Sequence, residues 1–236
     1  MIVAAHPDDE TIGASTLLRA AVSLIHVTDG APRNMADAQR CGFTCRDEYS
    51  RARRGELEEA IAVCGSSPEM TWLDIPDQEA SYNIPSIADR LSRAIREVRP
   101  AVVLTHPYEG GHPDHDACAA AVRLACGSAV PVWEFACYHN RGGSICTNEF
   151  LPGTDQGQTV ELKGLEKLQK MRMLECFRTQ RETLSSFGTT CERFRPAPDY
   201  DFAAPPHPGK LYYEQFDWGM RGERFRSIAA EVLAVC

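Results

Sequence analysis

Two short clusters of histidine and aspartate carry the side chains of this chain that could do chemistry. The first is AHPDDE, which places His6, Asp8 and Asp9 directly after a short apolar run. The second is HPDH, which places His112 and His115 after another apolar run, far downstream. Imidazole nitrogens and carboxylate oxygens together suit zinc, and two histidines with one carboxylate leave coordination positions open. That composition is typical of a catalytic rather than a structural zinc site.

The first cluster holds more acid than a helix start requires. Pro7 suits the first turn of a helix, and one carboxylate there would satisfy the helix dipole. Asp8, Asp9 and Glu10 together repel one another unless a divalent cation neutralises part of their charge. The three-residue spacing of His6 and Asp9 therefore indicates two ligands of one metal, which leaves Asp8 free to act on a water molecule. The alternative is an acidic helix cap beside a structural histidine.

The second cluster has the same arrangement at another predicted helix start. His112 and His115 are three residues apart, so both side chains can face one pocket. One can bind metal while the other donates hydrogen bonds, and Asp114 can fix a tautomer or raise a histidine pKa. The glycine pair before His112 lets the loop approach a ligand closely. A non-catalytic metal-binding protein would need neither Asp8 nor His112.

The elements that must position these clusters alternate between apolar strands and helices. Strands are predicted over residues 1–5, 22–28, 70–75, 101–105 and 132–138, and helices over 11–21, 47–64, 84–98, 113–126 and 163–179. We expect Asp29-Gly30 to form a turn and residues 31–46 to form a polar loop. His26 lies inside a predicted strand and is expected to be structural. Apolar strands with helical crossovers predict an α/β fold, a Rossmann-like, mostly parallel sheet with helices on both faces. Its site should lie beyond the carboxyl ends of the strands.

The last part of the chain has a different composition. Proline, glycine and aromatic residues dominate from residue 187 onward, and linkers rarely carry so many aromatics. We expect 187–236 to form an irregular C-terminal cap over the site, within a single domain spanning 1–236. A chain of 236 residues suits one large domain. His207 in this segment is a candidate to lie over the pocket.

Charge and composition narrow the class of partner. The net charge of −8 argues against nucleic acid, which requires a positive surface. No run is long and apolar enough for a membrane span, and no basic signal region precedes the first strand, so we expect no membrane partner. The 10 cysteines are scattered without a metal-binding pattern, which favours reduced thiols and a cytoplasmic location.

AHPDDE followed by HPDH resembles the PIG-L/LmbE family of zinc-dependent N-acetylglucosaminyl deacetylases, over roughly residues 1–140. The resemblance implies a hydrolase that removes an N-acetyl or N-acyl group from an N-acetylated amino sugar or glycoconjugate. It also implies one zinc ion per chain, bound by His6, Asp9 and His115. The family's fold is the Rossmann-like sheet that the strand pattern predicts.

The same resemblance implies the catalytic roles. Asp8 would be the general base that takes the proton of the attacking water. His112 would be the electrostatic stabiliser or general acid, held protonated by Asp114 as its orienting partner. The residues leave open whether Asp8 or His112 protonates the departing amine.

Three further residues resemble substrate-contacting positions less specifically. Arg53 in RRGELEEA corresponds to a sugar-contacting arginine, and Asp77 in LDIPDQ to an acidic residue that holds sugar hydroxyls. His106 ends a strand near the expected pocket and is a candidate substrate or supporting residue. The chain departs from some relatives at Gly110, where they carry an active-site tyrosine. Tyr108 could replace that tyrosine only from a different position.

Three other classes of protein are alternatives to a deacetylase. A nucleotide-binding Rossmann protein should have a glycine-rich turn after its first strand, whereas the carboxylates of HPDDE would repel phosphate. An amidase that acts on a thiol conjugate or another acyl amide would use the same metal motif. A non-catalytic metal-binding relative is the third alternative.

Overall fold

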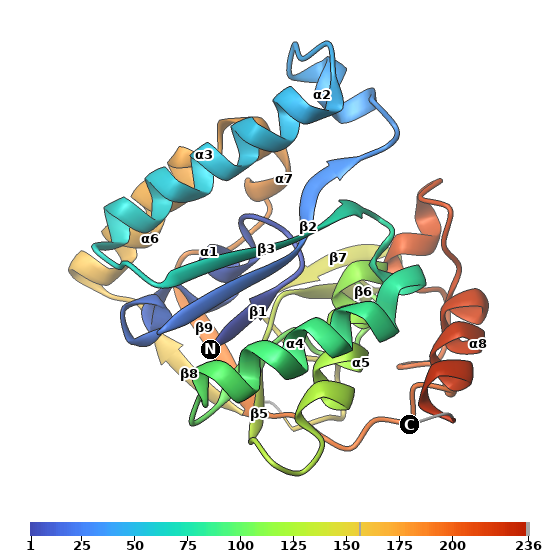
Figure 1. Ribbon diagram of the computed structural model, residues 1–236. Coiled ribbons are helices and arrows are strands. Elements are labelled where there is room, and N and C mark those ends of the chain that lie inside the picture. Colours follow the sequence, from blue (N-terminus) through green and yellow to red (C-terminus); the bar gives the residue numbers. More distant parts are fainter. Residues whose placement is uncertain (156, 235–236) are drawn as a thin grey trace.

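The computed structural model describes residues 1–155 and 157–234. Its centre is a seven-stranded sheet of order β3-β2-β1-β4-β5-β9-β8 (Figure 1). The strands are β1 (Ile2–Ala4), β2 (Ser23–Pro32), β3 (Glu69–Asp77), β4 (Val103–Thr105), β5 (Val132–Phe135), β8 (Gln158–Glu161) and β9 (Cys191–Pro196). The first five are parallel, whereas β9 and β8 are antiparallel to their neighbours. The predicted Rossmann-like, mostly parallel sheet is confirmed.

Helices cover both faces of the sheet (Figure 1). Helices α3 (Arg46–Cys64) and α6 (Gly164–Cys176) lie together on one face. Helices α4 (Ile84–Val98) and α5 (Pro113–Cys126) lie on the other, and α8 (Gly222–Leu233) packs beside them. The buried residues of α4 recur every three or four positions, which gives this helix one apolar stripe toward the core.

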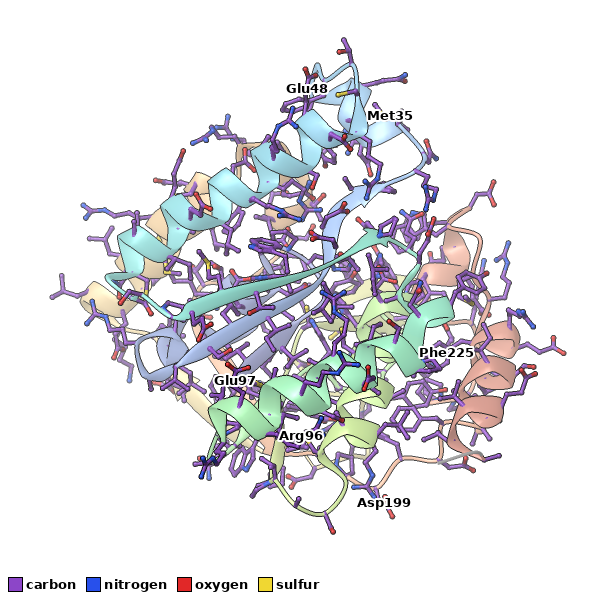
Figure 2. All side chains as sticks on the ribbon, in the orientation of Figure 1. Met35, Glu48, Arg96, Glu97, Asp199 and Phe225 are labelled. Atoms are coloured by element: carbon purple, nitrogen blue, oxygen red, sulfur yellow. The ribbon has the colours of Figure 1, made fainter. Side chains whose placement is uncertain are left out.

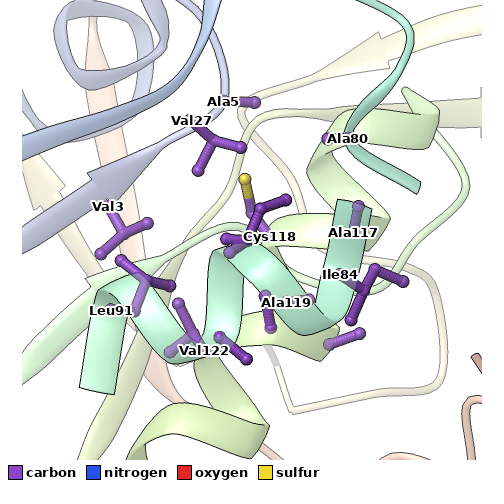
Figure 3. Close-up of a cluster of buried hydrophobic side chains, with 14 of the residues drawn as sticks. Val3, Ala5, Val27, Ala80, Ile84, Leu91, Ala117, Cys118, Ala119 and Val122 are labelled. Atoms are coloured by element: carbon purple, nitrogen blue, oxygen red, sulfur yellow. The ribbon is translucent and has the colours of Figure 1, made fainter. Parts of the chain in front are cut away.

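The larger core lies between the sheet and helices α4 and α5 (Figure 3). Val3 of β1 and Val27 of β2 meet Leu91 of α4 and Val122 of α5 there, and all four are fully buried. Each such side chain contributes roughly 1.5–3 kcal/mol by leaving water. Side chains fill the space between sheet and helices throughout the molecule (Figure 2). This packing fixes the strand ends that carry the two clusters.

The segment around the first two strands differs from its prediction. The helix expected over 11–21 is a short α1 (Asp9–Ala14) that continues as a 3₁₀ helix, η1 (Ser15–Ala20). Asp29-Gly30 does not end the strand, because β2 runs through it and pairs as far as Pro32 with Asp77 of β3. Sheet pairing across a register shift overrides the turn preference of the glycine. The expected loop over 31–46 contains a short helix, α2 (Ala36–Arg40).

The C-terminal segment is more regular than expected. It supplies β9 to the central sheet and the helix α8, joined by irregular chain. Strand β9 was not recognisable because two of its buried side chains, Glu192 and Arg195, are charged. Buried partners compensate them, Lys170 for Glu192 at 2.8 Å and Glu134 for Arg195 at 2.8 Å.

The remaining elements are short. The predicted strand over 132–138 divides into β5 and β6 (Tyr138–Arg141), which forms a separate hairpin with β7 (Ser144–Thr147). The others are η2 (Ala80–Asn83), η3 (Arg178–Gln180), α7 (Arg181–Leu184) and η4 (Tyr212–Gln215). Among the described residues, none of the helices combines the length and apolar character needed to cross a membrane.

Candidate active site

The sheet brings the two clusters together at one edge. Strands β1 and β4 are parallel neighbours, and the order of strands reverses at β1. Ligand sites of open α/β sheets lie at such a reversal, beyond the carboxyl ends of the strands. The loops after β1 and β4 carry His6 and His112, whose ring centroids are 4.4 Å apart. The His6 and His115 rings are 5.3 Å apart.

Asp9 lies between the two histidines that are expected to bind metal with it. His6 Nδ1 lies 3.1 Å from one oxygen of Asp9, and His115 Nε2 lies 3.2 Å from the other. Two ligands of a tetrahedral zinc with bonds of about 2.0–2.1 Å are themselves about 3.3 Å apart. The three side chains are almost completely buried, at 6%, 2% and 3% exposure. The distances from Asp9 to each of the two histidines are therefore of the size expected between ligands of one metal ion.

The charges around this point also fit a cation. Four buried carboxylates gather here, those of Asp8, Asp9, Asp77 and Asp114. Within the described chain, Arg53 is the sole arginine or lysine that pairs with any of them. Burial alone would raise the pKa of Asp9, but the surrounding histidines hold it well below the usual range. Because Asp9 stays ionised, protonation of this residue cannot relieve the excess negative charge. The charge therefore favours binding of a divalent cation.

An unpaired atom points to the same conclusion. His115 Nε2 is buried and has no hydrogen-bond partner, although a carboxylate oxygen of Asp9 faces it. A buried polar group of this kind is costly unless a ligand or ion satisfies it. The possible ligands form two groups, one of Asp9, His106, His115 and Cys137 and one of His6, Asp77, His112 and Asp114. The 3.1 Å contact between His6 and Asp9 joins the two groups. Together these features support a metal cofactor.

Asp114 has a different partner from the one expected. Its Oδ2 lies 3.2 Å from His6 Nε2, and its two oxygens accept the backbone N–H groups of Gln78 and Ala80 at 2.6 and 2.9 Å. The distance from Asp114 Oδ2 to His112 Nδ1 is 3.8 Å, which is too long for a hydrogen bond. The expectation that Asp114 orients His112 through its carboxylate is therefore wrong. Its carboxylate instead leaves His6 Nδ1 available for a metal.

His112 is the N-terminal cap of α5. Its Nδ1 accepts the backbone N–H of Asp114 at 3.1 Å, so the proton of a neutral ring sits on Nε2. Burial, and then the nearby His6, lower the pKa of His112 well below its usual value. This corrects the expectation that Asp114 would raise that pKa and keep His112 charged. The Trp218 ring covers His112, with centroids 4.7 Å apart.

Asp8 points away from the expected metal ligands. One of its oxygens accepts the Arg53 Nη2 at 2.7 Å, while Asp9 faces the histidines. Arg53 is itself fixed by the Gly30 carbonyl, at 2.5 Å from Nη1. Burial raises the pKa of Asp8 to about 8, against the lowering effect of Arg53. A carboxylate with a pKa near neutrality, beside a cation site, is suited to accept a proton.

The three predicted substrate residues do not share one environment. Arg53 and Asp77 line the pocket in front of His6 and Asp8. His106 does not, because it is fully buried behind Asp9. Its Nε2 accepts the Ala5 N–H at 3.0 Å and lies 3.3 Å from an Asp9 oxygen. Burial, with the adjacent His115, lowers the pKa of His106 to about 3, so the ring is neutral and carries its proton on Nδ1, away from Asp9.

The pocket is also lined by residues that the sequence did not predict. Its cavity volume is about 130 Å³. Tyr49 and Gln180, joined by a 2.7 Å hydrogen bond, form part of the polar wall. The i, i+4 spacing of Tyr49 and Arg53 was the one local signal for this wall. Further lining residues are Asp37, Tyr138, Leu184, Phe187 and Trp218.

Some relatives carry an active-site tyrosine where this chain has Gly110, and Tyr108 is the nearby residue that could replace it. Tyr108 is buried at 2% exposure and donates its hydroxyl to the Ala204 carbonyl at 2.9 Å, away from the pocket. It therefore does not replace the tyrosine that some relatives carry. The tyrosine that does line the pocket is Tyr138, whose ring centroid is 5.1 Å from that of His115.

Relatives of known name match about half of the chain. A 1D-myo-inositol 2-acetamido-2-deoxy-alpha-D-glucopyranoside deacetylase of Nocardioides sp. is 31% identical over 165 residues, 56% of this chain and 55% of the relative. A mycothiol S-conjugate amidase of Streptomyces coelicolor is 30% identical over 139 residues, 49% of this chain and 47% of the relative. The chain thus spans about half the length of these relatives.

Solved structures share the fold. A deacetylase from the teicoplanin biosynthesis pathway matches with a TM-score of 0.62 at 19% identity, over 84% of this chain and 99% of that one. A 4-carboxy-2-hydroxymuconate hydratase of Pseudomonas putida matches with a TM-score of 0.59 at 17% identity, over 85% and 96%. At such identities the likeness shows the fold alone, and the fold serves more than one reaction.

A family model covers the part of the chain that carries both clusters. The model described as PIG-L, GlcNAc-PI de-N-acetylase, matches residues 1–126, more than half of the chain. This range contains His6, Asp8 and Asp9 at its start and His112 to His115 near its end. The chain therefore belongs to the PIG-L family.

Proposed function

We propose that this chain is a zinc-dependent hydrolase that removes an N-acetyl or N-acyl group from an amino-sugar-containing small molecule. The observation that carries the proposal is the contact of both His6 and His115 with Asp9, with Asp8 beside them in the lining of a pocket. The family description and the names of the relatives, which include deacetylases of acetamido sugars, support the same reaction class.

His6, Asp9 and His115 would hold the metal. Two imidazoles and a carboxylate suit zinc and leave room for a water and a substrate oxygen. When bound, the ion would supply Lewis acidity that activates water and polarises the amide carbonyl. Asp114 would keep His6 in place by accepting a hydrogen bond from its Nε2.

Asp8 would act as the general base. It accepts a proton from water as the oxygen adds to the amide carbon, and Arg53 holds the carboxylate in place. Burial raises the pKa of Asp8 to about 8 in the protein without metal, so its protonated form is stable near neutral pH. A bound cation would lower this pKa and free the carboxylate to accept a proton. Asp8 can therefore return this proton to the nitrogen as the C–N bond breaks, which yields a free amine and a carboxylic acid that then ionises by releasing its proton to water.

His112 would act as a neutral hydrogen-bond donor. Its Nδ1 is occupied by the Asp114 N–H, so only Nε2–H can face the oxygen that gains negative charge in the transition state. A ring held neutral in this way stabilises the oxyanion without supplying its proton. This assigns protonation of the amine to Asp8.

Arg53 and Asp77 would contact the sugar. Both are buried at the base of the pocket, where a guanidinium and a carboxylate can bind hydroxyl groups. Tyr49 and Gln180 extend this polar wall outward, and Trp218 offers an aromatic face beside His112. Hydroxyl recognition on one side and an aromatic face on the other suit a sugar ring.

An amidase that acts on a thiol conjugate is the second candidate. It is favoured by the likeness to the Streptomyces coelicolor mycothiol S-conjugate amidase, whose name describes cleavage of a different amide. The metal ligands and Asp8 would serve both reactions equally. The walls of the pocket decide between them, because they contact the parts of the substrate that differ.

The test is amine release from a panel of amides. Purified protein, stripped of metal and reloaded with zinc, would be incubated with N-acetylated amino sugars, longer N-acyl sugars and acyl amides of thiols. We expect turnover of at least one acetamido sugar, its loss on chelation and its return with zinc. Full turnover by verified metal-free protein would overturn the proposal, and turnover of thiol amides alone would favour the amidase.

A further inference from the structure

The backbone of Asp8 has an unusual conformation. Its φ is 152° and its ψ is −26°, a combination that residues with a side chain rarely adopt. Such strain persists only where surrounding contacts fix it, and it is concentrated at functional sites. The conformation separates the directions of two consecutive carboxylates, since Asp8 faces Arg53 while Asp9 faces the histidines. Contacts from neighbouring residues must hold this backbone conformation.

A buried glutamate contacts this peptide directly. The Asp8 N–H donates to Oε2 of Glu10 at 3.2 Å. The glutamate side chain thus reaches back across the turn to the residue two positions before it. The Asp8 carbonyl accepts the N–H groups of Thr11 and Ile12, both at 2.9 Å, as the first bonds of α1. The N–H of Asp8 is thus fixed by a side chain, and its carbonyl by the helix.

A histidine from the neighbouring strand fixes that glutamate. His26 Nε2 donates to the same Oε2 atom at 3.0 Å, and the Thr11 hydroxyl donates to Oε1 at 2.6 Å. His26 in turn stacks on Trp72 of β3, with ring centroids 4.6 Å apart and planes at 22°. Glu10 and His26 are both fully buried, so neither can touch a substrate. Three adjacent strands therefore contribute to the position of one peptide group.

We propose that Glu10 and His26 are positioning residues for Asp8: they hold its peptide in the strained conformation that aims its carboxylate at the pocket. The inference rests on Asp8 being the base of the proposed function. A glutamate that served only the dipole of α1 could remain at the surface. Burial beside a histidine, with an acceptor bond to the strained residue itself, indicates a more specific task. His26 is then more than the structural residue that the sequence indicated.

Steady-state kinetics with an active acetamido sugar tests this assignment. In Glu10→Ala we expect kcat to fall about tenfold or more, the order for a misplaced catalytic group, with KM and zinc content close to the parent. Glu10→Gln should recover most of kcat, because its amide oxygen can still accept the Asp8 N–H. His26→Leu keeps the packing against Trp72 but removes the donor, and should lower kcat in the same direction.

A matched control separates positioning from general destabilisation. Leu24 lies two residues before His26 on the same face of β2 and is fully buried. Leu24→Ala should lower the melting temperature while kcat stays near the parent value. A kcat in Glu10→Ala equal to that of the parent, or reduced no more than in Leu24→Ala, would overturn the proposal.

A second measurement needs no activity. Asp8→Gly and Asp8→Ala both lose the carboxylate, but only glycine adopts the observed conformation without strain. We expect Asp8→Gly to melt at the higher temperature, and this difference to shrink when either change is combined with Glu10→Ala. An equal difference in both backgrounds would show that Glu10 does not hold the peptide. Absence of amide hydrolysis in the parent protein would instead contradict the proposed function and leave this comparison intact.

Discussion

His6 Nε2 and Asp114 Oδ2 lie 3.2 Å apart, so an aspartate of the second cluster holds a histidine of the first. The two residues are 108 positions apart in the chain. The contact fixes the His6 ring with Nε2 toward Asp114 and Nδ1 toward Asp9. Carboxylates behind metal-binding histidines set the tautomer and raise the basicity of the ligand nitrogen.

This contact predicts that Asp114 acts on metal affinity. Asp114→Asn should weaken zinc binding by about 10- to 100-fold, the usual effect of losing such a partner. Competition with a chromophoric chelator measures the affinity directly, and His112→Ala serves as the control that should leave it unchanged. Wild-type affinity in Asp114→Asn would show that His6 needs no partner.

Asp8 and Asp9 should separate into a base and a ligand. Asp8→Asn keeps the donor set of the metal and should lose about 10² or more in turnover, within the range of a general base. Asp9→Asn should lose zinc itself, because both histidines face its oxygens. Zinc content by mass spectrometry and kcat of the reloaded proteins distinguish the two. If Asp8→Asn is as metal-poor as Asp9→Asn, the roles are wrongly divided.

Substitution of His112 should lower kcat/KM at every pH and leave the shape of its pH profile unchanged. Because the pKa of His112 is lowered well below its usual value by burial and by His6, the ring stays neutral from mildly acidic to alkaline pH. His112→Ala should then cost about 2–4 kcal/mol of transition-state stabilisation, the effect of one oxyanion donor. The limbs of kcat/KM against pH should remain where they are in the parent. Loss of the alkaline limb in the variant would show that His112 acts while charged.

A buried charge cluster away from the metal ligands links stability to pH. Arg195 donates to Glu134 at 2.8 Å and to Glu109 at 3.1 Å, and all three are at most 2% exposed. One cation cannot compensate two buried carboxylates. Burial raises the pKa of Glu134 to about 8 and that of Glu109 to about 7, although Arg195 opposes both shifts. We therefore expect at least one of the two to carry a proton in the folded state.

The free energy of unfolding should fall as the pH rises through this range. Below the ordinary glutamate pKa of 4.5 both states are protonated, and this contribution to stability is complete. Above it the unfolded chain releases protons that the folded chain retains, so stability is lost up to the raised pKa values, by an amount on the order of 3 kcal/mol. Urea denaturation at several pH values measures the slope, and Glu134→Gln should flatten it. Identical slopes in parent and variant would place the linkage elsewhere.

The sequence by itself determined the parts of this protein that follow from local pattern. Apolar runs separated by amphipathic helices predicted the parallel sheet, because strands buried on both faces must be apolar along their length. The position of His6 after the first strand and of His115 after the fourth predicted one shared site, because parallel strands end at the same edge. The spacing and the repulsion between adjacent carboxylates indicated His6 and Asp9 as ligands and left Asp8 free, whereas the choice of His115 over His112 came from the resemblance to the PIG-L/LmbE family.

Only the tertiary structure decided which atoms meet. Whether Asp114 turns to His6 or to His112 depends on the loop after β3, whose N–H groups bind its oxygens. His106 and His112 are neutral because of burial, which no spacing of residues reveals. Strand β9 could not be recognised, since its charged side chains become acceptable inside the protein only beside partners such as Lys170. Contacts between residues far apart in the chain depend on the packed fold, and local sequence pattern carries no record of them.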